Sequence, residues 1–230
     1  MSGDFSQSAR RLGPWLAMLL GTGLAGCGGG GDSSDPPQQS QDPPTNPTPP
    51  AETLPPLSAT VVDLNDNHAV GADHWPEGAT SDGAQGQTVG GLDCLANMPE
   101  TYHVHTHLSI FLNGEALAVP GHVGIVQQSG GTECFYSVHT HDKSGKLHVE
   151  AAAAGMFTLG QFFAEWGETL DSANIAGLTG MPVVVYVTDD GKVTKATGDW
   201  HDIELKSHRE ITIQVGTAIT EIPNFTWAAN

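Results

Sequence analysis

Histidines alternate with other side chains in two short stretches of this sequence. The first stretch carries His103, His105 and His107 between Tyr102 and Leu108. In an extended strand, successive side chains point to opposite faces, so these imidazoles share one face and the intervening residues share the other. The pattern predicts a strand with one imidazole face, which is a candidate metal site, and one mostly apolar face.

The second stretch repeats this pattern with a turn inside it. His139 and His141 precede Asp142-Lys-Ser-Gly145, which has the composition of a turn, and His148 follows it. These features predict a hairpin in which His148 stands opposite His139, with directly paired Cβ atoms roughly 4.5–5.5 Å apart. The two imidazoles would then reach one ion.

Neutral imidazole nitrogens suit Zn, Cu, Ni and Fe ions, and without a methionine cluster to favour Cu(I) the expected cofactor is a transition metal ion, Cu(II) or Zn(II). Residues two apart on a strand are separated by roughly 6.6 Å, whereas metal–nitrogen bonds are about 2 Å long. The three histidines of the first stretch are therefore not expected to share one ion. Either two of them join the second stretch, or two neighbouring sites are present.

The candidate metal ligands are the histidines of the two stretches: His103, His105, His107, His139, His141 and His148. Asp142 and Glu150 are further candidates, as ligands or as hydrogen-bond acceptors that fix an imidazole tautomer. Each also has a plainer explanation, because Asp142 suits the start of a turn and Glu150 the end of a strand. For the histidines, the alternative is a solvated or hydrogen-bonded polar face.

Other motifs add no second site. His201 and His208, near Asp199 and Asp202, are interpreted as residues of a surface loop. The familiar HExxH, GxSxG, phosphate-loop and dinucleotide glycine patterns are missing from the sequence, so no catalytic residue is assigned.

Charge narrows the choice of partners. The 230 residues include 26 Asp and Glu against 8 Lys and Arg, for a formal net charge of −18. Such an acidic chain is not expected to bind nucleic acid or an anionic membrane surface, and cations are its natural counterpart. The sequence does not identify a protein partner.

The N-terminus resembles a bacterial lipoprotein signal. Arg10-Arg11 precedes an apolar run, Leu12 to Ala25, that ends in the lipobox-like Leu24-Ala25-Gly26-Cys27. The resemblance implies that residues 1–26 are a signal peptide, that Cys27 is lipidated, and that the protein is exported and lipid-anchored in the cell envelope. The alternative is an ordinary secretory signal with Cys27 incidental. Residues 27–57, rich in Gly and Pro, are expected to be a disordered tether, because this composition cannot bury a core.

Two further cysteines, Cys94 and Cys134, each lie just outside a histidine stretch. In an oxidising compartment they most simply form one disulfide, which would clamp the two stretches together. The alternative is a metal site of Cys and His, but the CxxC spacing that usually marks such sites is missing.

A single domain of about 130 to 170 residues is expected, with an α+β fold. A hairpin is predicted from Tyr102 to Val119 with Asn113-Gly114 as its turn, and further strands at 183–188, 192–197 and 210–215. One amphipathic helix is predicted from Thr158 to about Leu170, opened by a capping box of Thr158 and Gln161. Its apolar stripe should pack on the face of a mixed, mostly antiparallel sheet opposite the histidines, in an arrangement for which β-grasp is one candidate.

The expected organisation is an irregular arm at residues 58–93, a histidine-rich globular domain at 94–222, and a C-terminal tail at 223–230. From Cys94 to Val215 the chain resembles a family of largely uncharacterised, secreted or lipid-anchored prokaryotic proteins. The shared motifs are Tyr102 to Leu108, Asn113-Gly114, Cys134 to Glu150 and Phe157 to Gly167. The resemblance implies an exported histidine-rich domain and transfers no activity.

Two functions of different class follow. The first is a lipid-anchored protein that captures, buffers or delivers Cu or Zn. The second is a metal-dependent enzyme, redox or hydrolytic, whose ion keeps an open position beside a cavity. A solvent-open histidine face would favour the first and an apolar concave cavity the second.

Overall fold

The computed structural model describes residues 53–65, 67–78 and 83–227. The predicted signal peptide, Cys27 and the tether up to residue 52 lie outside the described residues. No helix among the described residues is long and apolar enough to cross a membrane.

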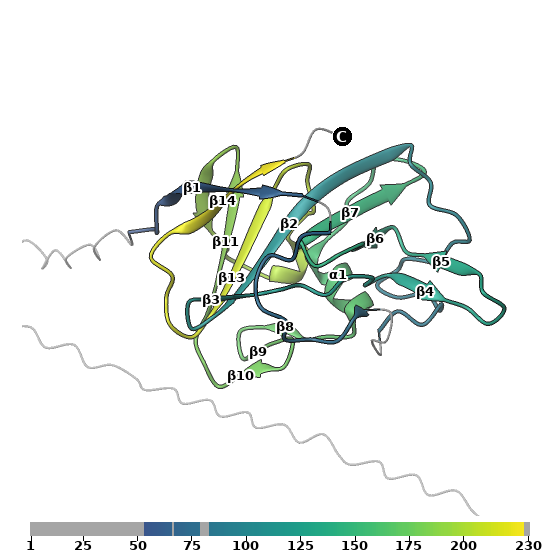
Figure 1. Ribbon diagram of the computed structural model, residues 1–230, viewed down its shortest axis with the longest axis horizontal. Helices are drawn as coiled ribbons and strands as arrows, with labels where there is room; N and C mark the ends of the chain where they lie inside the picture. The colour runs from purple at the N-terminus through teal and green to yellow at the C-terminus, as the bar shows by residue number, and fades with distance from the viewer. Residues whose placement is uncertain (1–52, 66, 79–82, 228–230) are drawn as a thin grey trace, which may run out of the picture. The chain divides into compact units, whose positions relative to one another are not determined.

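A mixed sheet of seven strands carries both histidine stretches (Figure 1). Six strands follow one another in the order β12-β11-β13-β2-β7-β6, and β3 also pairs with β2. Only β13 and β2 run parallel, so the sheet is largely antiparallel. The strands are β2 (Tyr102–Leu112), β3 (Glu115–Leu117), β6 (Val138–His139), β7 (Lys146–Ala151), β11 (Val183–Asp189), β12 (Lys192–Lys195) and β13 (Glu210–Val215).

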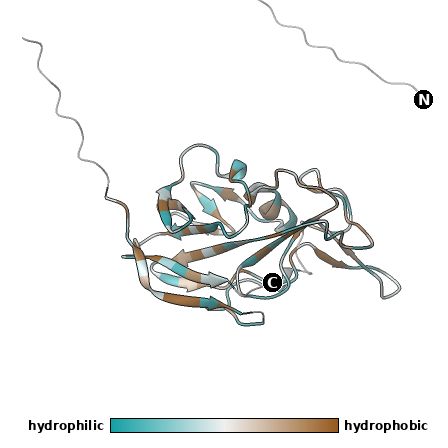
Figure 2. Ribbon diagram, turned by 90° about the horizontal axis from the view of Figure 1, so that it is seen from above, coloured by the Kyte–Doolittle hydropathy of each residue, from teal (hydrophilic) through white to brown (hydrophobic). Residues whose placement is uncertain are grey.

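The two faces of this sheet differ in chemistry. Leu108 and Ile110 of β2 are buried in the main hydrophobic core together with Phe162 and Phe163 of helix α1 (Leu159–Trp166). Because side chains alternate along β2, its histidines lie on the opposite face, as predicted. Figure 2 shows hydrophobic and hydrophilic residues following one another along individual strands. The α+β fold, with one helix packed on a mixed sheet, is confirmed.

Helix α1 begins as the sequence predicts and ends earlier. The side chain of Thr158 accepts from the Gln161 backbone N–H, and the Gln161 side chain accepts from the Thr158 N–H, which completes the capping box. The predicted end near Leu170 is wrong, because Gly167 adopts a left-handed conformation (φ 79°) that terminates the helix after Trp166. Leu170 belongs instead to a short strand.

Smaller elements surround the sheet. Ile125–Gln127 (β4) and Glu133–Phe135 (β5) form a hairpin, and β8 (Leu170–Asp171), β9 (Asn174–Ile175) and β10 (Leu178–Thr179) form a three-stranded sheet. A short 3₁₀ helix, η2, spans Trp200–Asp202. These elements carry none of the histidines of the two stretches.

The ends of the described chain form a parallel pair that the sequence did not predict. β1 (Leu57–Leu64) pairs with β14 (Ile222–Trp227), where an irregular arm and a tail were expected. The pairing joins segments from opposite ends of the domain, so no local sequence pattern predicts it. This β1–β14 pair lies against the polar face of the sheet, where the Phe225 ring is 4.0 Å from that of His107 (Figure 1).

Cys94 and Cys134 form the expected disulfide, with Cα atoms 5.3 Å apart. It attaches the segment before β2 to β5, shortly before the second histidine stretch. Disulfides of this kind are typical of proteins from oxidising compartments outside the cytoplasm.

Removing the disulfide should destabilise the domain. The bond closes a loop with a sequence separation of 40, and the unfolded-chain entropy restored on opening such a loop corresponds to about 4 kcal/mol. Urea denaturation of a Cys94→Ser/Cys134→Ser variant should show a lower free energy of unfolding by that order. Reductant should weaken the parent chain by a similar amount and leave the variant unaffected, whereas a parent chain insensitive to reductant would contradict the assignment.

Candidate metal centre

Strand pairing gathers histidines from both stretches on one face of the sheet. His105 of β2 pairs with His148 of β7, and His148 pairs on its other side with His139 of β6. The predicted opposition of His139 and His148 is therefore observed. His103 stands opposite Glu150 two residues further along, on the same face.

The gathered side chains form two overlapping groups of metal-ligating atoms, in each of which these atoms lie within 4.8 Å of one another. One group contains His103, His105 and His148. The other contains His139, His141, His148 and Glu150. These six residues are called the histidine cluster below, and His148 belongs to both groups.

Distances within the histidine cluster fit a coordination shell. The Nε2 atom of His105 lies 3.0 Å from Nε2 of His103 and 3.0 Å from Nδ1 of His148. The Nε2 atoms of His139 and His141 are 3.3 Å apart. Two nitrogens bound tetrahedrally at 2.0–2.1 Å from zinc are about 3.3 Å apart, so small adjustments would let these nitrogens share an ion.

Glu150 is the anionic centre of the cluster. Its Oε1 atom lies 3.2 Å from Nε2 of His103, 3.5 Å from Nδ1 of His148 and 3.8 Å from Nε2 of His139. The residue is only 4% exposed, and among the described residues its Oε2 atom has no hydrogen-bond partner. A buried carboxylate oxygen without a partner is costly unless a cation or a donor reaches it.

A backbone acceptor orients one imidazole. Nδ1 of the fully buried His139 lies 3.0 Å from the carbonyl oxygen of Tyr136. Because a carbonyl can only accept, Nδ1 must carry the proton in the neutral ring, and the lone pair of Nε2 then points toward His141. A sequence pattern of side-chain types cannot reveal this backbone contact.

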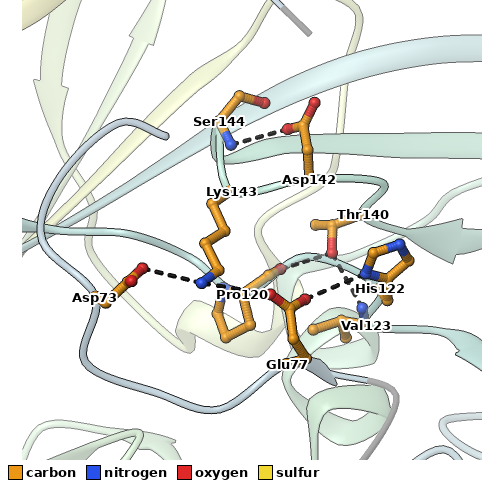
Figure 3. A network of polar contacts seen from close by, with 9 residues as sticks. All are labelled: Asp73, Glu77, Pro120, His122, Val123, Thr140, Asp142, Lys143 and Ser144. Atoms are coloured by element: carbon orange, nitrogen blue, oxygen red, sulfur yellow. Dashed lines mark hydrogen bonds and ion pairs between the residues drawn. The ribbon is translucent and has the colours of Figure 1, made fainter. Parts of the chain in front are cut away.

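The loop between His139 and His141 is fixed by Thr140 (Figure 3). The Thr140 hydroxyl donates to the carbonyl of Pro120 at 2.7 Å and accepts from the Val123 N–H at 3.1 Å. Both contacts are buried, and they hold the backbone that carries the two imidazoles.

Asp142 serves the turn and lies outside both groups of ligating atoms. One of its carboxylate oxygens accepts from the Ser144 N–H at 2.9 Å and the other from the Asn67 N–H at 2.5 Å. Burial by itself would raise the pKa of Asp142, but the hydrogen bonds from Ser144 and Asn67 outweigh it and leave the pKa below its usual value. The turn explanation given for this residue is thus the one that the contacts support.

Lys143 attaches the arm to the same turn. Its Nζ lies 3.0 Å from Oδ1 of Asp73 and 3.3 Å from Oε1 of Glu77 (Figure 3). The other carboxylate oxygen of Glu77, Oε2, lies 3.1 Å from Nδ1 of His122. The arm residues thereby support the turn that joins His141 to β7.

His107 lies apart from the other candidate ligands. It is 1% exposed, its Nε2 lies 2.9 Å from the carbonyl of Ser144, and its ring contacts Phe225. It stands opposite Lys146, where the turn approaches β2 so closely that a Cβ on Gly145 would lie 2.8 Å from the His107 ring. Its ring packs beneath the β1–β14 pair, a contact that alternation along β2 could not predict.

The remaining histidines occupy separate places. Nδ1 of the exposed His201 lies 2.8 Å from the carboxylate of Asp199, and His208 stacks on Trp227 with ring centroids 4.7 Å apart. His74 packs edge-on against Trp75. None of these belongs to either group of ligating atoms within the described part of the chain.

Burial favours the neutral form of His105, His139 and His141 by lowering their pKa values. Burial and then the neighbouring His148 and His103 lower the pKa of His105 to about 3. Burial likewise dominates the lowering of the His139 pKa to about 3, and it lowers the pKa of His141. For Glu150, burial alone would raise the pKa, but the His148 hydrogen bond and the nearby His139 and His103 outweigh it and lower the pKa to about 2. Neutral imidazoles beside a carboxylate are the protonation states that bind metals.

Comparison of the chain with protein-family models, with curated proteins and with solved structures found no match. The family resemblance drawn from the motifs stays a prediction. The functional inference therefore depends on the geometry and chemistry of the site.

Acid should destabilise the metal-free domain most steeply between about pH 4.5 and pH 3. His105 and His139 have pKa values of about 3 when folded against 6.5 as the reference, so the unfolded state binds more protons between these values and stability falls as pH falls. Each histidine contributes at most about 1.4 kcal/mol per pH unit. Above pH 4.5 Glu210 has the opposite effect. Its folded pKa is raised to about 7, so its protonation stabilises the folded state as the pH falls.

Urea denaturation of the metal-free chain across this pH range checks this expectation. A His105→Gln variant should lose stability less steeply with falling pH, and a His68→Gln variant, altered at an exposed position outside the cluster, should follow the parent. Identical slopes in all three would show that His105 is not held neutral by burial.

Proposed function

We propose that this protein is an exported, lipid-anchored metal-binding protein that captures, buffers or delivers copper or zinc ions through the histidine cluster. The observation that carries the proposal is Glu150, a buried carboxylate surrounded by imidazoles with one oxygen unpartnered among the described residues. The buried imidazoles resist protonation, so they do not readily supply the missing positive charge. A metal cation would supply it and would use the imidazole lone pairs at the same time.

The group of His139, His141, His148 and Glu150 is the better-equipped ion site. It offers three nitrogens and one carboxylate oxygen, a set that suits Zn(II) or Cu(II) and differs from the all-oxygen shells of Ca²⁺ and Mg²⁺. In this role His139 is the preoriented ligand and Glu150 balances the charge. His103 and His105 lie beside this group and share His148 with it. They would form a second position through which an ion could enter or leave.

Exposure favours capture and release over catalysis. His103 and His141 lie at the surface, whereas His105, His139 and Glu150 form a buried base. Among the described residues, four cavities of about 510, 490, 200 and 160 Å³ are each lined by residues outside the histidine cluster. The alternative, a metal-dependent enzyme, calls for a substrate cavity beside the ion, so the binder is the function we prefer.

Export and anchoring are supported by two independent features. The disulfide between Cys94 and Cys134 is typical of an oxidising compartment. The sequence that ends in Cys27 resembles a lipoprotein signal. A lipid anchor on Cys27 would hold the metal-binding domain at the membrane without a spanning helix.

Loss of His148 should abolish high-affinity metal binding, because this residue belongs to both groups of ligating atoms. Elemental analysis of the chain purified without an affinity tag, followed by titration with Zn(II) and Cu(II), should show bound metal in the parent. Affinity should fall at least about 100-fold in His148→Ala and in His139→Ala, since even loss of a residue that only orients a ligand costs 10- to 100-fold.

His201→Ala provides the matched control, because it removes an exposed imidazole that lies outside the cluster. It should retain the metal content of the parent. Equal metal content in the parent, His139→Ala and His148→Ala would rule out the proposed function.

A further inference from the structure

A second region of the polar face forms a small cavity away from the histidine cluster. Its volume is about 200 Å³, and it lies where β11 and β13 meet the β1–β14 pair. The residues that matter for its chemistry are Thr188, Asp190, His208, Glu210, Phe225 and Trp227. It is called the Glu210 cavity below.

Two buried side-chain oxygen atoms of this cavity lack hydrogen-bond partners among the described residues. Thr188 of β11 and Glu210 of β13 are directly paired, so both side chains share the face covered by β14. They are 3% and 7% exposed. The Glu210 carboxylate accepts from the Phe225 backbone N–H, yet its Oε2 atom and the Thr188 hydroxyl have no hydrogen-bond partner. Native proteins rarely leave two such neighbouring atoms unsatisfied.

The acidic residues that line the Glu210 cavity favour a positively charged ligand. Asp190 and Glu210 are acidic, and the lining contains no Lys or Arg. The nearby Arg209 is engaged elsewhere, with its guanidinium 2.7 and 2.8 Å from the carboxylate oxygens of Asp189. Burial raises the pKa of Glu210 to about 7, which reflects the missing positive partner.

The residues that line the Glu210 cavity favour an organic cation over a metal ion. No described residue of the cavity belongs to a group of three or more clustered metal-ligating atoms. Phe225 and Trp227 contribute aromatic surface instead, and His208 stacks on Trp227 with an interplanar angle of 25°. Aromatic faces attract ammonium groups and cover their carbon chains.

We propose that the Glu210 cavity binds a small organic molecule with a primary ammonium group, which Glu210 and Thr188 hold while Trp227 and Phe225 contact its carbon chain. The ammonium group would donate to Oε2 of Glu210 and to the Thr188 hydroxyl, so both unpartnered atoms gain a partner. About 200 Å³ is room for roughly six or seven waters, which limits the ligand to a molecule of similar size. This binding site is additional to the metal centre and independent of it.

The test is calorimetric titration of the metal-free full chain with n-butylammonium chloride at about pH 8, where Glu210 is ionised. Saturable 1:1 binding is expected, at least tenfold tighter than binding of 1-butanol, which has the same number of heavy atoms and no charge. Absence of saturable binding, or equal affinity for the two probes, would overturn the proposal.

Variants identify the site. Glu210→Gln should weaken n-butylammonium binding at least tenfold, and Thr188→Val should weaken it severalfold without a change in charge. Glu133→Gln, which removes an exposed carboxylate on β5, should bind like the parent. Parent-like affinity in Thr188→Val and in folded Glu210→Gln would overturn the assignment, and if Glu210→Gln does not fold, Thr188→Val decides alone.

Discussion

The register of β2, β7 and β6 is the constraint on which the candidate metal centre depends. His105, His148 and His139 lie in one row because the three strands pair in phase. A shift of one residue in either pairing would move a histidine to the apolar face. Packing of Leu147 and Val149 in the main core opposes that shift, because both would then point away from helix α1. The hydrophobic core thus fixes the strand register that brings the imidazoles together.

Burial of this cluster creates a demand for a cation. Burial lowers the pKa values of His105 and His139, so these imidazoles resist protonation, and Glu150 beside them remains anionic. A polar network that is only partly satisfied is costly in a low-dielectric setting. The same reasoning applies at Glu210, where the neighbouring groups differ and an organic cation is the better match. One polar face therefore carries two candidate sites, and the ring of His107, which contacts Phe225 of the Glu210 cavity, belongs to neither group of ligating atoms among the described residues.

Local chemistry made much of this arrangement predictable. The turn at residues 142–145 set the opposition of His139 and His148, and Thr158 with Gln161 set the start of the helix. The helix was predicted too long because the apolar stripe continues to Leu170, which belongs to β8. The left-handed Gly167 ends the helix before that residue. The contact by which β14 covers His107 joins distant segments and could not be predicted, and the contact of His139 with the Tyr136 carbonyl depends on local backbone geometry that a pattern of side-chain types does not specify. The sequence did not predict the Glu210 cavity, because its lining comes from segments far apart in the chain.

The account is tested most directly by a crystal structure of the zinc-loaded protein with anomalous diffraction measured on both sides of the zinc absorption edge. It predicts an anomalous peak about 2.0–2.1 Å from a ring nitrogen of His148, with His139 and His141 completing the shell and Oε2 or Oε1 of Glu150 bound. A peak found only at surface groups such as His201 and Asp199, with the cluster free of metal, would contradict it.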